Sequence, residues 1–266
     1  MHKHKIAAFP FDVRPGEVAT NLRSALAAVE QAASSGAELL VLPEKWTTSF
    51  LPSFSTAMRE DSEAALMELH KFALSKDLTV VGSAPGGDGD KPSNELHFLG
   101  AAGDLRPYRK RMLFSPTGEG RQVNRGTEMP ATIETPIGKV CALICYDLRF
   151  PEVCRPALYD QADLLVCCAQ WPNPRVSIFE LMSRSRAAEN QLWTISCNRA
   201  GIAGLDEKLM EFPGMALCVD PLGEISARVD DGSLLICEVD YAQADKVRKI
   251  LPLARDLQKA GLWARD

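Results

Sequence analysis

The sequence of 266 residues lacks the features that mark membrane and nucleic-acid-binding proteins. No apolar run approaches the roughly 20 residues of a transmembrane helix, and no signal peptide is visible, since the first apolar stretch ends at Asp12. Like charges form no long block, and the net charge is −5 with an isoelectric point near 5.5. We therefore expect neither a membrane nor a nucleic acid as a partner.

The cysteines and histidines show no metal-binding or dithiol pattern. The eight cysteines contain no CxxC spacing, and Cys167 and Cys168 are adjacent, which suits neither a simple disulfide nor a zinc site. The four histidines, at positions 2, 4, 70 and 97, form no ligand motif. Because most cysteines lie inside apolar runs, we expect free thiols packed in a core, a reducing cytoplasmic location and no metal.

The first 42 residues predict a βαβ unit. A strand is expected at residues 5–12 and another at residues 38–42, where Pro43 ends it. Between them, apolar residues from Val18 to Ala33 recur at intervals of three or four, which is typical of an amphipathic helix. A right-handed crossover would make the two strands parallel. Since 46% of the residues are hydrophobic, the chain can bury a large core, and we expect an α/β protein with a single domain over residues 1–266.

The later pattern resembles a weak internal duplication, with strands alternating with helices and hairpins. We expect the core to span residues 5–240, and residues 250–266, which have no clear period, to pack on a neighbouring subunit. The other expected helices cover residues 61–77, with an N-cap at Asp61 or Ser62, and residues 151–161, 178–191 and 240–249. The other expected strands include residues 78–83, 95–101, 105–112, 163–168 and 192–197, and residues 200–213 are expected to form a loop.

The segment from Lys139 to Glu152 has the pattern of a strand, a sharp turn and a helix. Its apolar run ends at Cys145, and Pro151 suits the first turn of a helix. Such a turn raises one side chain above the sheet beside free backbone N–H groups, so Cys145 is a candidate nucleophile. The alternative is a buried packing residue, as free cysteine commonly is.

Three further residues are candidate site residues. Glu44 follows the second strand, at the carboxyl end where α/β proteins collect ligands, although it could be an exposed loop residue. Alternation along residues 105–112 turns Lys110 inward if Arg109 and Arg111 face solvent; otherwise all three lie on an exposed edge strand. Glu119 lies in residues 114–128, a long stretch without period that is typical of a functional loop.

Four segments in this order resemble the nitrilase, or carbon-nitrogen hydrolase, superfamily over roughly residues 5 to 240. They are LVLPEKW, YRKRMLF, ICYDLRFPE, and AQWPNPR with the following SRAAENQ. The resemblance implies a four-layer αββα sandwich and a Glu–Lys–Cys triad without metal or organic cofactor. It makes Glu44 the general base, Lys110 the oxyanion stabiliser together with the N–H of Tyr146, and Cys145 the nucleophile. A second active-site glutamate of the superfamily matches Glu119.

Within the superfamily, PEKWTTSF and AQWPNPR are most similar to the ω-amidase and Nit branch. Ser49 replaces the usual glycine of that branch, and Met112 stands where many members have histidine. The resemblance implies hydrolysis of small amides such as 2-oxoglutaramate or 2-oxosuccinamate, with release of ammonia, and a homo-oligomer. Substrate-binding candidates are Trp46, Arg149, Trp171 and Arg175; Trp46 could equally cover the core, and the arginines could form surface salt bridges.

Other functions remain open at this point. The same triad would serve an N-carbamoyl amine amidohydrolase, a deaminated-glutathione amidase or a nitrilase. A non-catalytic scaffold of this fold would be expected to lack a triad residue, whereas all three are present. A thiol-based redox protein is disfavoured by the absence of CxxC.

Overall fold

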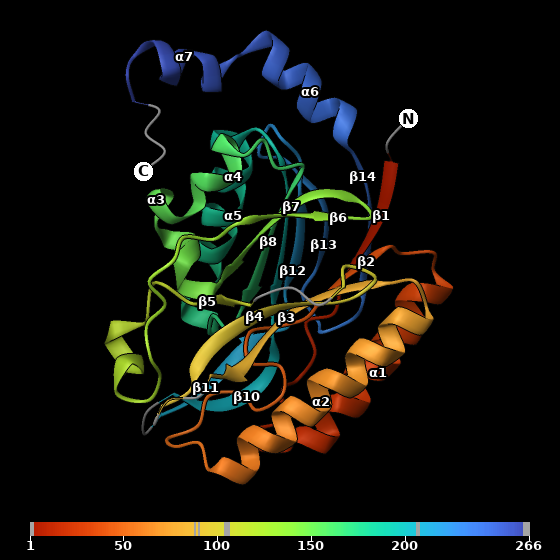
Figure 1. Cartoon of the computed structure of the whole chain (residues 1–266), viewed down its shortest axis with the longest axis vertical. Coiled ribbons are helices and arrows are strands. Elements are labelled where there is room, and N and C mark those ends of the chain that lie inside the picture. The colour runs from red at the N-terminus through yellow and green to blue at the C-terminus, as the bar shows by residue number, and fades with distance from the viewer. Residues whose placement is uncertain (1–2, 88, 90, 104–106, 206–207, 263–266) are drawn as a thin grey trace.

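Two six-stranded sheets form the centre of the protein (Figure 1). The structure is a computed structural model that describes residues 3–87, 89, 91–103, 107–205 and 208–262. The first sheet has the order β14 (Leu235–Asp240), β1 (Lys3–Ala8), β2 (Leu39–Val41), β3 (Thr79–Gly86), β4 (Ser93–Gly100), β5 (Tyr108–Arg109). The second sheet has the order β13 (Ile225–Val229), β12 (Ala216–Val219), β9 (Trp193–Asn198), β8 (Leu164–Ala169), β7 (Gly138–Ile144), β6 (Thr132–Thr135).

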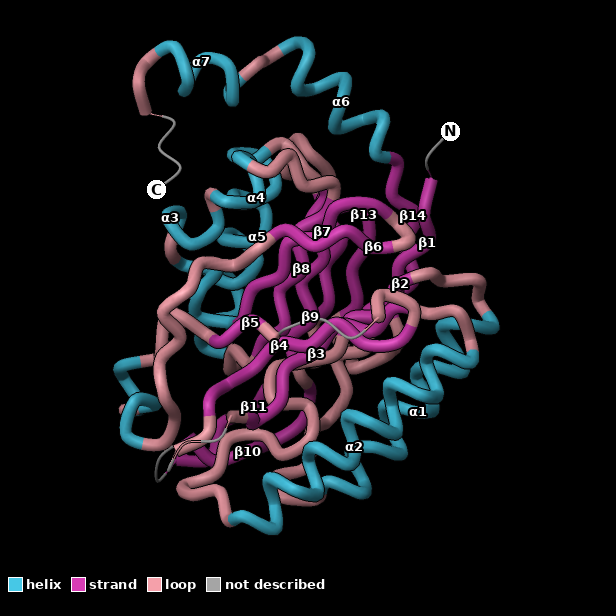
Figure 2. Tube along the Cα trace, viewed as in Figure 1, coloured by secondary structure: helices cyan, strands magenta, loops and turns pink. Residues whose placement is uncertain are grey.

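Helices cover the outer face of each sheet, which makes four layers (Figure 2). Helices α1 (Val18–Ser34) and α2 (Thr56–Ser75) pack on the first sheet. Helices α3 (Pro151–Cys154), α4 (Pro156–Tyr159) and α5 (Val176–Asn190) lie beside the second sheet. The predicted αββα sandwich is therefore confirmed.

The period of two along β1 explains how the layers hold together. Ile6 and Ala8 point into the apolar core between the two sheets, where they join residues such as Leu143 and Val166. Ala7, between them, points the other way into the core beneath α1 and α2. Alternate side chains of one strand thus bury apolar surface on both faces, which is the dominant favourable term in folding.

The predicted parallel βαβ unit is confirmed. Strands β1 and β2 are parallel with Ile6 opposite Leu39, and β2 is parallel to β3. In the second sheet β7, β8 and β9 are parallel neighbours. Parallel strands direct their carboxyl ends to the same edge, which is where the candidate residues follow them.

Two helices differ from their predicted bounds. Helix α2 begins at Thr56, and its N-cap is Ser55, whose hydroxyl accepts a hydrogen bond from the Met58 N–H at 3.2 Å. The predicted caps Asp61 and Ser62 lie inside this helix. The helix predicted over residues 151–161 is divided into α3 and α4 because Pro156 has no N–H for a continuous ladder.

The loop predicted over residues 200–213 is instead a β-hairpin of β10 (Ala200–Leu205) and β11 (Lys208–Pro213). Its antiparallel register pairs Ala200 with Pro213 and Ala203 with Met210, while residues 206–207 lie outside the described residues. Glycines in β10 weaken its strand propensity, and the pairing with β11 overrides this.

Shorter elements complete the chain. Of the strand predicted over residues 105–112, only Tyr108–Arg109 pairs with β4, and residues 104–106 lie outside the described residues. The predicted cap Asp240 does precede α6 (Tyr241–Ile250), followed by α7 (Leu253–Lys259), which the sequence pattern did not predict; residues 263–266 are not described. The 3-10 helices are η1 (Ser115–Thr117), η2 (Glu119–Arg121), η3 (Cys145–Arg149) and η4 (Asn173–Arg175). Among the described helices, none has the length and apolar character needed to cross a membrane.

Candidate active site

The structure brings Glu44, Lys110 and Glu119 into one buried cluster. The Lys110 Nζ donates to Glu44 Oε1 at 2.7 Å and to the two carboxylate oxygens of Glu119 at 2.9 and 3.1 Å. The Lys110 side chain is fully buried, so the inward orientation expected from strand alternation is observed. Its own N–H donates to the Asn94 carbonyl at 2.9 Å, which fixes it beside β4 at the end of β5.

The charges of this cluster support one another. Burial acts to lower the pKa of Lys110, but the carboxylates of Glu119 and Glu44 outweigh it and hold that pKa well above the usual value. Burial acts to raise the pKa of Glu119, and Lys110 and Lys45 reverse the shift and lower it. Lys110 is therefore a permanent cation and Glu119 a permanent anion near neutral pH.

Glu44 has one bound oxygen and one free oxygen. Its Oε1 accepts hydrogen bonds from Lys110 and from the Asn94 Nδ2, the latter at 2.8 Å. Its Oε2 is buried, and no side-chain or backbone donor of the described residues is within hydrogen-bonding geometry of it. The Glu44 carbonyl accepts from the Gln170 Nε2 at 2.5 Å, so the backbone is held from the end of β8. A fixed carboxylate with one unoccupied oxygen has the form expected of a general base.

Cys145 occupies a strained turn directly after β7. Its φ of 50° is in the left-handed region, which costs a residue with a Cβ about 1–3 kcal/mol. Burial raises the pKa of the Cys145 thiol well above its usual value, the nearby Glu44 raises it further, and Lys110 opposes the shift. The sulfur is therefore a neutral thiol at rest, and it needs a base to become a nucleophile.

A second buried network, centred on Arg199, contacts Gln170, which in turn holds the Glu44 backbone. Arg199 is completely buried, and its guanidinium donates to Ser49 Oγ at 2.6 Å, to the Val13 carbonyl at 2.6 Å and to Asp12 Oδ1 at 3.0 Å. The same guanidinium reaches Gln170 Oε1 at 3.3 Å. Burial lowers the pKa of Arg199 to about 10, with Asp12 opposing the shift. This network orients the amide of Gln170.

Ser49, which replaces the usual glycine of the ω-amidase branch, has a positive φ of 58°. Glycine adopts this conformation without strain, which explains the preference for it. Here the hydroxyl of Ser49 compensates by accepting from Arg199 and donating to Gln170 Oε1 at 3.3 Å. At the other departure, Met112, the backbone N–H donates to Asp147 Oδ1 at 2.8 Å.

Three of the predicted substrate-binding residues, Tyr146, Arg149 and Arg175, have side chains that contact aromatic rings. Tyr146 lies beside Cys145 with its ring against those of Phe114 and Phe150, each at 5.1 Å between centroids. The Arg149 guanidinium lies 5.2 Å from the Trp171 ring, and the Arg175 guanidinium lies 4.8 Å from the Phe114 ring.

Both predicted tryptophans are buried in apolar cores. Trp171 lies in the core around the second sheet, with its ring centroid 5.7 Å from that of Phe179, and Trp46 lies fully buried in the core beneath α1 and α2. A Cβ at Gly82 would lie 2.8 Å from its ring, so a strand glycine makes room for it. Its place in the core matches the alternative interpretation from the sequence. The aromatic residue of this loop that meets the site is Phe50, whose ring centroid is 5.9 Å from Lys110 Nζ.

Sequence reasoning did not single out Lys45 or Asp147. Lys45 follows Glu44 directly, is fully buried, and has its Nζ 4.4 Å from the centroid of the Phe50 ring. Asp147 is buried below Cys145 and accepts three hydrogen bonds. Lys45 is part of the motif PEKW and Asp147 is part of YDLR, so both are visible in the sequence as charged residues. Periodicity alone, however, does not predict that a charged residue directly after a strand is buried.

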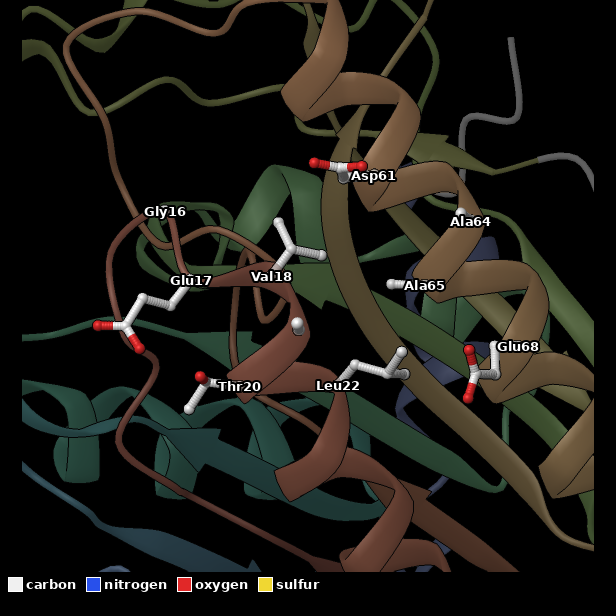
Figure 3. Close-up of a pocket in the computed structure, with 10 residues that line it drawn as sticks. Gly16, Glu17, Val18, Thr20, Leu22, Asp61, Ala64, Ala65 and Glu68 are labelled. Atoms are coloured by element: carbon white, nitrogen blue, oxygen red, sulfur yellow. The ribbon is translucent and has the colours of Figure 1, made fainter.

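A separate cavity of about 520 Å³ lies between the start of α1 and the middle of α2 (Figure 3). Carboxylates of Glu17, Asp61 and Glu68 surround it together with the apolar Val18 and Leu22. None of the residues that line it belongs to the Glu44 cluster, so it is a feature of the helical layer and not of the candidate active site.

Comparisons with known proteins agree with this architecture. The family model for carbon-nitrogen hydrolase matches residues 5–249. The chain is 31% identical over 261 residues to 2-oxoglutaramate amidase of Bacillus subtilis (strain 168), covering 97% of this chain and 98% of that protein. It is 29% identical over 251 residues to a chloroplastic omega-amidase of Arabidopsis thaliana, covering 88% of this chain and 67% of that protein.

Solved structures share the fold over nearly the whole chain. A CN-hydrolase superfamily protein from Xanthomonas campestris superposes with a TM-score of 0.83 at 24% identity, covering 96% of this chain and 97% of that one. A mutant amidase from Nesterenkonia sp. AN1, with the acetamide moiety of fluoroacetamide added covalently at its active site cysteine, superposes with a TM-score of 0.81 at 25% identity, covering 95% and 96%. The protein is an amidase, and it belongs to the carbon-nitrogen hydrolase family.

Proposed function

We propose that the protein is an ω-amidase, which hydrolyses the terminal amide of a small 2-oxo acid monoamide through a thioester on Cys145. The observation that carries the proposal is the buried ion pair of Lys110 and Glu44, at 2.7 Å, which leaves Glu44 Oε2 without a donor among the described residues. Cys145 is presented by its left-handed turn, and Glu44 is among the groups that act on its pKa.

The charges suggest the order of steps. Glu44 takes the thiol proton as the sulfur attacks the amide carbon, because the thiol is protonated at rest. The carbonyl oxygen becomes an oxyanion, which the charge of Lys110 and the N–H of Tyr146 stabilise. Glu44 then gives its proton to the nitrogen, ammonia leaves, and the thioester remains. Water activated by Glu44 hydrolyses the thioester and restores the thiol.

We assign Glu119 to the support of Lys110. Both of its carboxylate oxygens accept from Lys110 Nζ, and the Phe114 N–H donates to its Oε2 at 2.7 Å. Glu119 therefore holds the Lys110 ammonium in place and keeps it charged, and it shares with Glu44 the neutralisation of this buried charge.

Two relatives indicate the substrate class. The Bacillus subtilis and Arabidopsis thaliana proteins are named for 2-oxoglutaramate and for ω-amides, so 2-oxoglutaramate and 2-oxosuccinamate are the substrates we propose for this chain. Hydrolysis of N-carbamoyl amines, deaminated glutathione or nitriles would use the same triad. Of these, N-carbamoyl amines and nitriles release ammonia and are therefore the comparison substrates. A scaffold without activity would not need these four charged or nucleophilic side chains, Glu44, Lys110, Glu119 and Cys145, all buried.

The decisive experiment measures ammonia release from 2-oxoglutaramate and 2-oxosuccinamate beside glutamine, asparagine, N-carbamoyl amines and simple nitriles. We expect turnover of the 2-oxo amides by the wild type and none by the Cys145→Ala variant. The matched control is Cys218→Ala, which alters a buried cysteine of β12. Turnover restricted to another substrate would overturn the substrate assignment, and full activity of Cys145→Ala would overturn the mechanism.

We also propose a homo-oligomer in a reducing compartment, the cytoplasm. The C-terminal helices α6 and α7 project from the sheets in Figure 1, and they leave Ile250 and Leu251 largely exposed, at 84% and 53%. Exposed large apolar residues that adjoin one another are typical of an interface. The eight cysteines are all free thiols, which suits a reducing compartment. Light scattering of the intact chain and of an Ile250→Glu variant tests the assembly.

A further inference from the structure

Lys45 is a buried cation that the triad does not use. Its side chain is fully buried, and its Nζ has no hydrogen-bond partner among the described residues. The turn that holds it is well fixed, because the Lys45 N–H donates to Ser83 Oγ at 2.8 Å and the Trp46 N–H donates to the Ser83 carbonyl at 2.9 Å. Its φ of 44° is in the left-handed region, so the orientation of this lysine also carries backbone strain.

The immediate neighbours of the amine do not satisfy it. The Nζ lies 4.4 Å from the centroid of the Phe50 ring and 5.1 Å from that of Phe54. Ring faces attract a cation, but they do not replace acceptors for the three N–H groups of an ammonium. A buried ammonium without acceptors is costly, so a ligand that supplies an acceptor would be bound strongly at this position.

Lys45 lies close enough to the candidate active site to interact electrostatically with its residues. Both amines lie near the same aromatic ring, since the centroid of Phe50 is 4.4 Å from Lys45 Nζ and 5.9 Å from Lys110 Nζ. The charges that act on Lys45 are those of the site itself, namely Glu119, Glu44, Lys110 and Cys145. The carboxylates of Glu44 and Glu119 are, however, already hydrogen-bonded to Lys110. The site thus contains one satisfied lysine and one lysine with free donors.

We propose that Lys45 binds the carboxylate of the substrate, at the end of the molecule remote from the amide that Cys145 attacks. This inference rests on the proposed function, and it assigns a binding residue to the carboxylate that the proposed substrates share as anionic monoamides, that is, as dicarboxylic acids with one end amidated. An anionic end would accept hydrogen bonds from the free ammonium, whereas a neutral amide or an alkyl end would leave it unsatisfied. Discrimination of this kind is large because it depends on a buried charged donor.

Burial lowers the pKa of Lys45, and the carboxylates of Glu119 and Glu44 oppose the shift. Binding of an anion would therefore raise that pKa toward its ordinary value and couple substrate binding to protonation of the amine.

Turnover of a matched pair of substrates tests the proposal. Succinamate and succinamide differ only in a carboxylate against an amide at the remote end. We expect Lys45→Met to reduce the ratio of kcat/KM for succinamate over that for succinamide by roughly 10- to 100-fold, the range for a lost hydrogen bond between charged groups, mainly through KM for succinamate. The control Lys139→Met removes a surface lysine paired with Glu134 at 3.8 Å and should leave the ratio unchanged. An unchanged ratio in Lys45→Met would overturn the proposal.

Binding without turnover separates this proposal from the proposed function. Calorimetry measures the affinity of succinate for the Cys145→Ala protein and for the Cys145→Ala protein that also carries Lys45→Met. Weaker binding in the double variant by a similar factor supports the anionic subsite, even if no amide is hydrolysed by the wild type. Equal affinity in the two proteins, or no measurable binding to Cys145→Ala, would overturn it. Far-ultraviolet circular dichroism of each variant establishes that it is folded.

Discussion

The Asp147 Oδ1 accepts a hydrogen bond from the backbone N–H of Met112 at 2.8 Å. Met112 comes two residues after Lys110, and Asp147 comes two residues after Cys145, so one contact joins the two segments that carry the proposed cation and nucleophile. The other oxygen, Oδ2, accepts from the Tyr108 hydroxyl at 3.0 Å and from the Ile144 N–H at 3.2 Å. The relative position of Lys110 and Cys145 therefore depends on a buried carboxylate outside the triad.

Removal of this carboxylate should destabilise the fold and reduce activity. Asp147→Ala leaves three buried donors without an acceptor, and we expect a loss of about 3 kcal/mol or more in the free energy of unfolding, measured by urea denaturation. The matched control is Asp231→Ala, since Asp231 accepts the Ser233 N–H at 3.0 Å on an exposed turn, and it should change stability little. Equal stability of Asp147→Ala and the wild type would contradict the assigned role.

Stability should also depend on pH through Asp147. Burial raises the pKa of Asp147 from 3.8 to about 6, although its hydrogen bonds oppose the shift. The folded state thus binds the proton more tightly than the unfolded state, and the favourable contribution present below pH 3.8 is lost as the pH rises through about 6. The difference in unfolding free energy between wild type and Asp147→Asn should therefore fall by about 3 kcal/mol between pH 3.5 and 7. A difference that is constant over this range would show that Asp147 titrates normally.

Glu44→Gln should greatly slow turnover while preserving the fold. Glutamine keeps an oxygen for the hydrogen bonds from Lys110 and Asn94, and Lys110 retains Glu119, but no base remains for the thiol proton. We expect kcat to fall by about 10²- to 10⁴-fold, as is typical for loss of a general base. Steady-state ammonia release checks this result, with the exposed Glu134→Gln as control. Retention of kcat in Glu44→Gln would assign the proton transfer to another group.

Substitutions at Ser49 should separate backbone strain from hydrogen bonding. Ser49→Ala keeps the strained φ of 58° and loses the hydroxyl that binds Arg199, whereas Ser49→Gly loses the hydroxyl but relieves the strain. We expect the order of stability to be wild type, then Ser49→Gly, then Ser49→Ala. The total loss for alanine should be about 2 kcal/mol, because the lost bond is to a charged donor. Thermal unfolding measures the order, and a glycine variant more stable than wild type would mean that strain outweighs the Arg199 contact.

The hydrophobic pattern of the sequence predicts the site residues that lie in or directly after strands. The alternation expected along residues 105–112 places Lys110 inward, and its side chain is buried although it directly follows the two-residue strand β5. The end of the apolar run places Cys145 on a turn directly after β7. The N-terminus of α2 is not determined in the same way. Ser55 caps that helix after a loop without period, so an earlier cap competes with Asp61 and Ser62 and only the packing of the helix decides between them.

Lys45 shows what the sequence cannot reveal without the fold. A lysine in a loop is normally exposed, and its burial here depends on a positive φ and on Ser83, which is 38 residues away in the chain. The β10–β11 hairpin is a similar case, since its glycine-containing strand is stabilised by pairing with a later segment. Contacts of this kind between distant residues are not encoded in the period of either segment alone.

The eight free thiols have a consequence for the irreversible inactivation of the protein. All of them are buried in the folded state, and they include the adjacent Cys167 and Cys168 and the neighbours Cys218 and Cys237. Unfolding exposes the whole set at once, and we expect dissolved oxygen to oxidise the exposed thiols to disulfides in competition with refolding. We therefore expect heat inactivation in air to follow the rate of unfolding, and unfolding to be reversible only when a reductant is present.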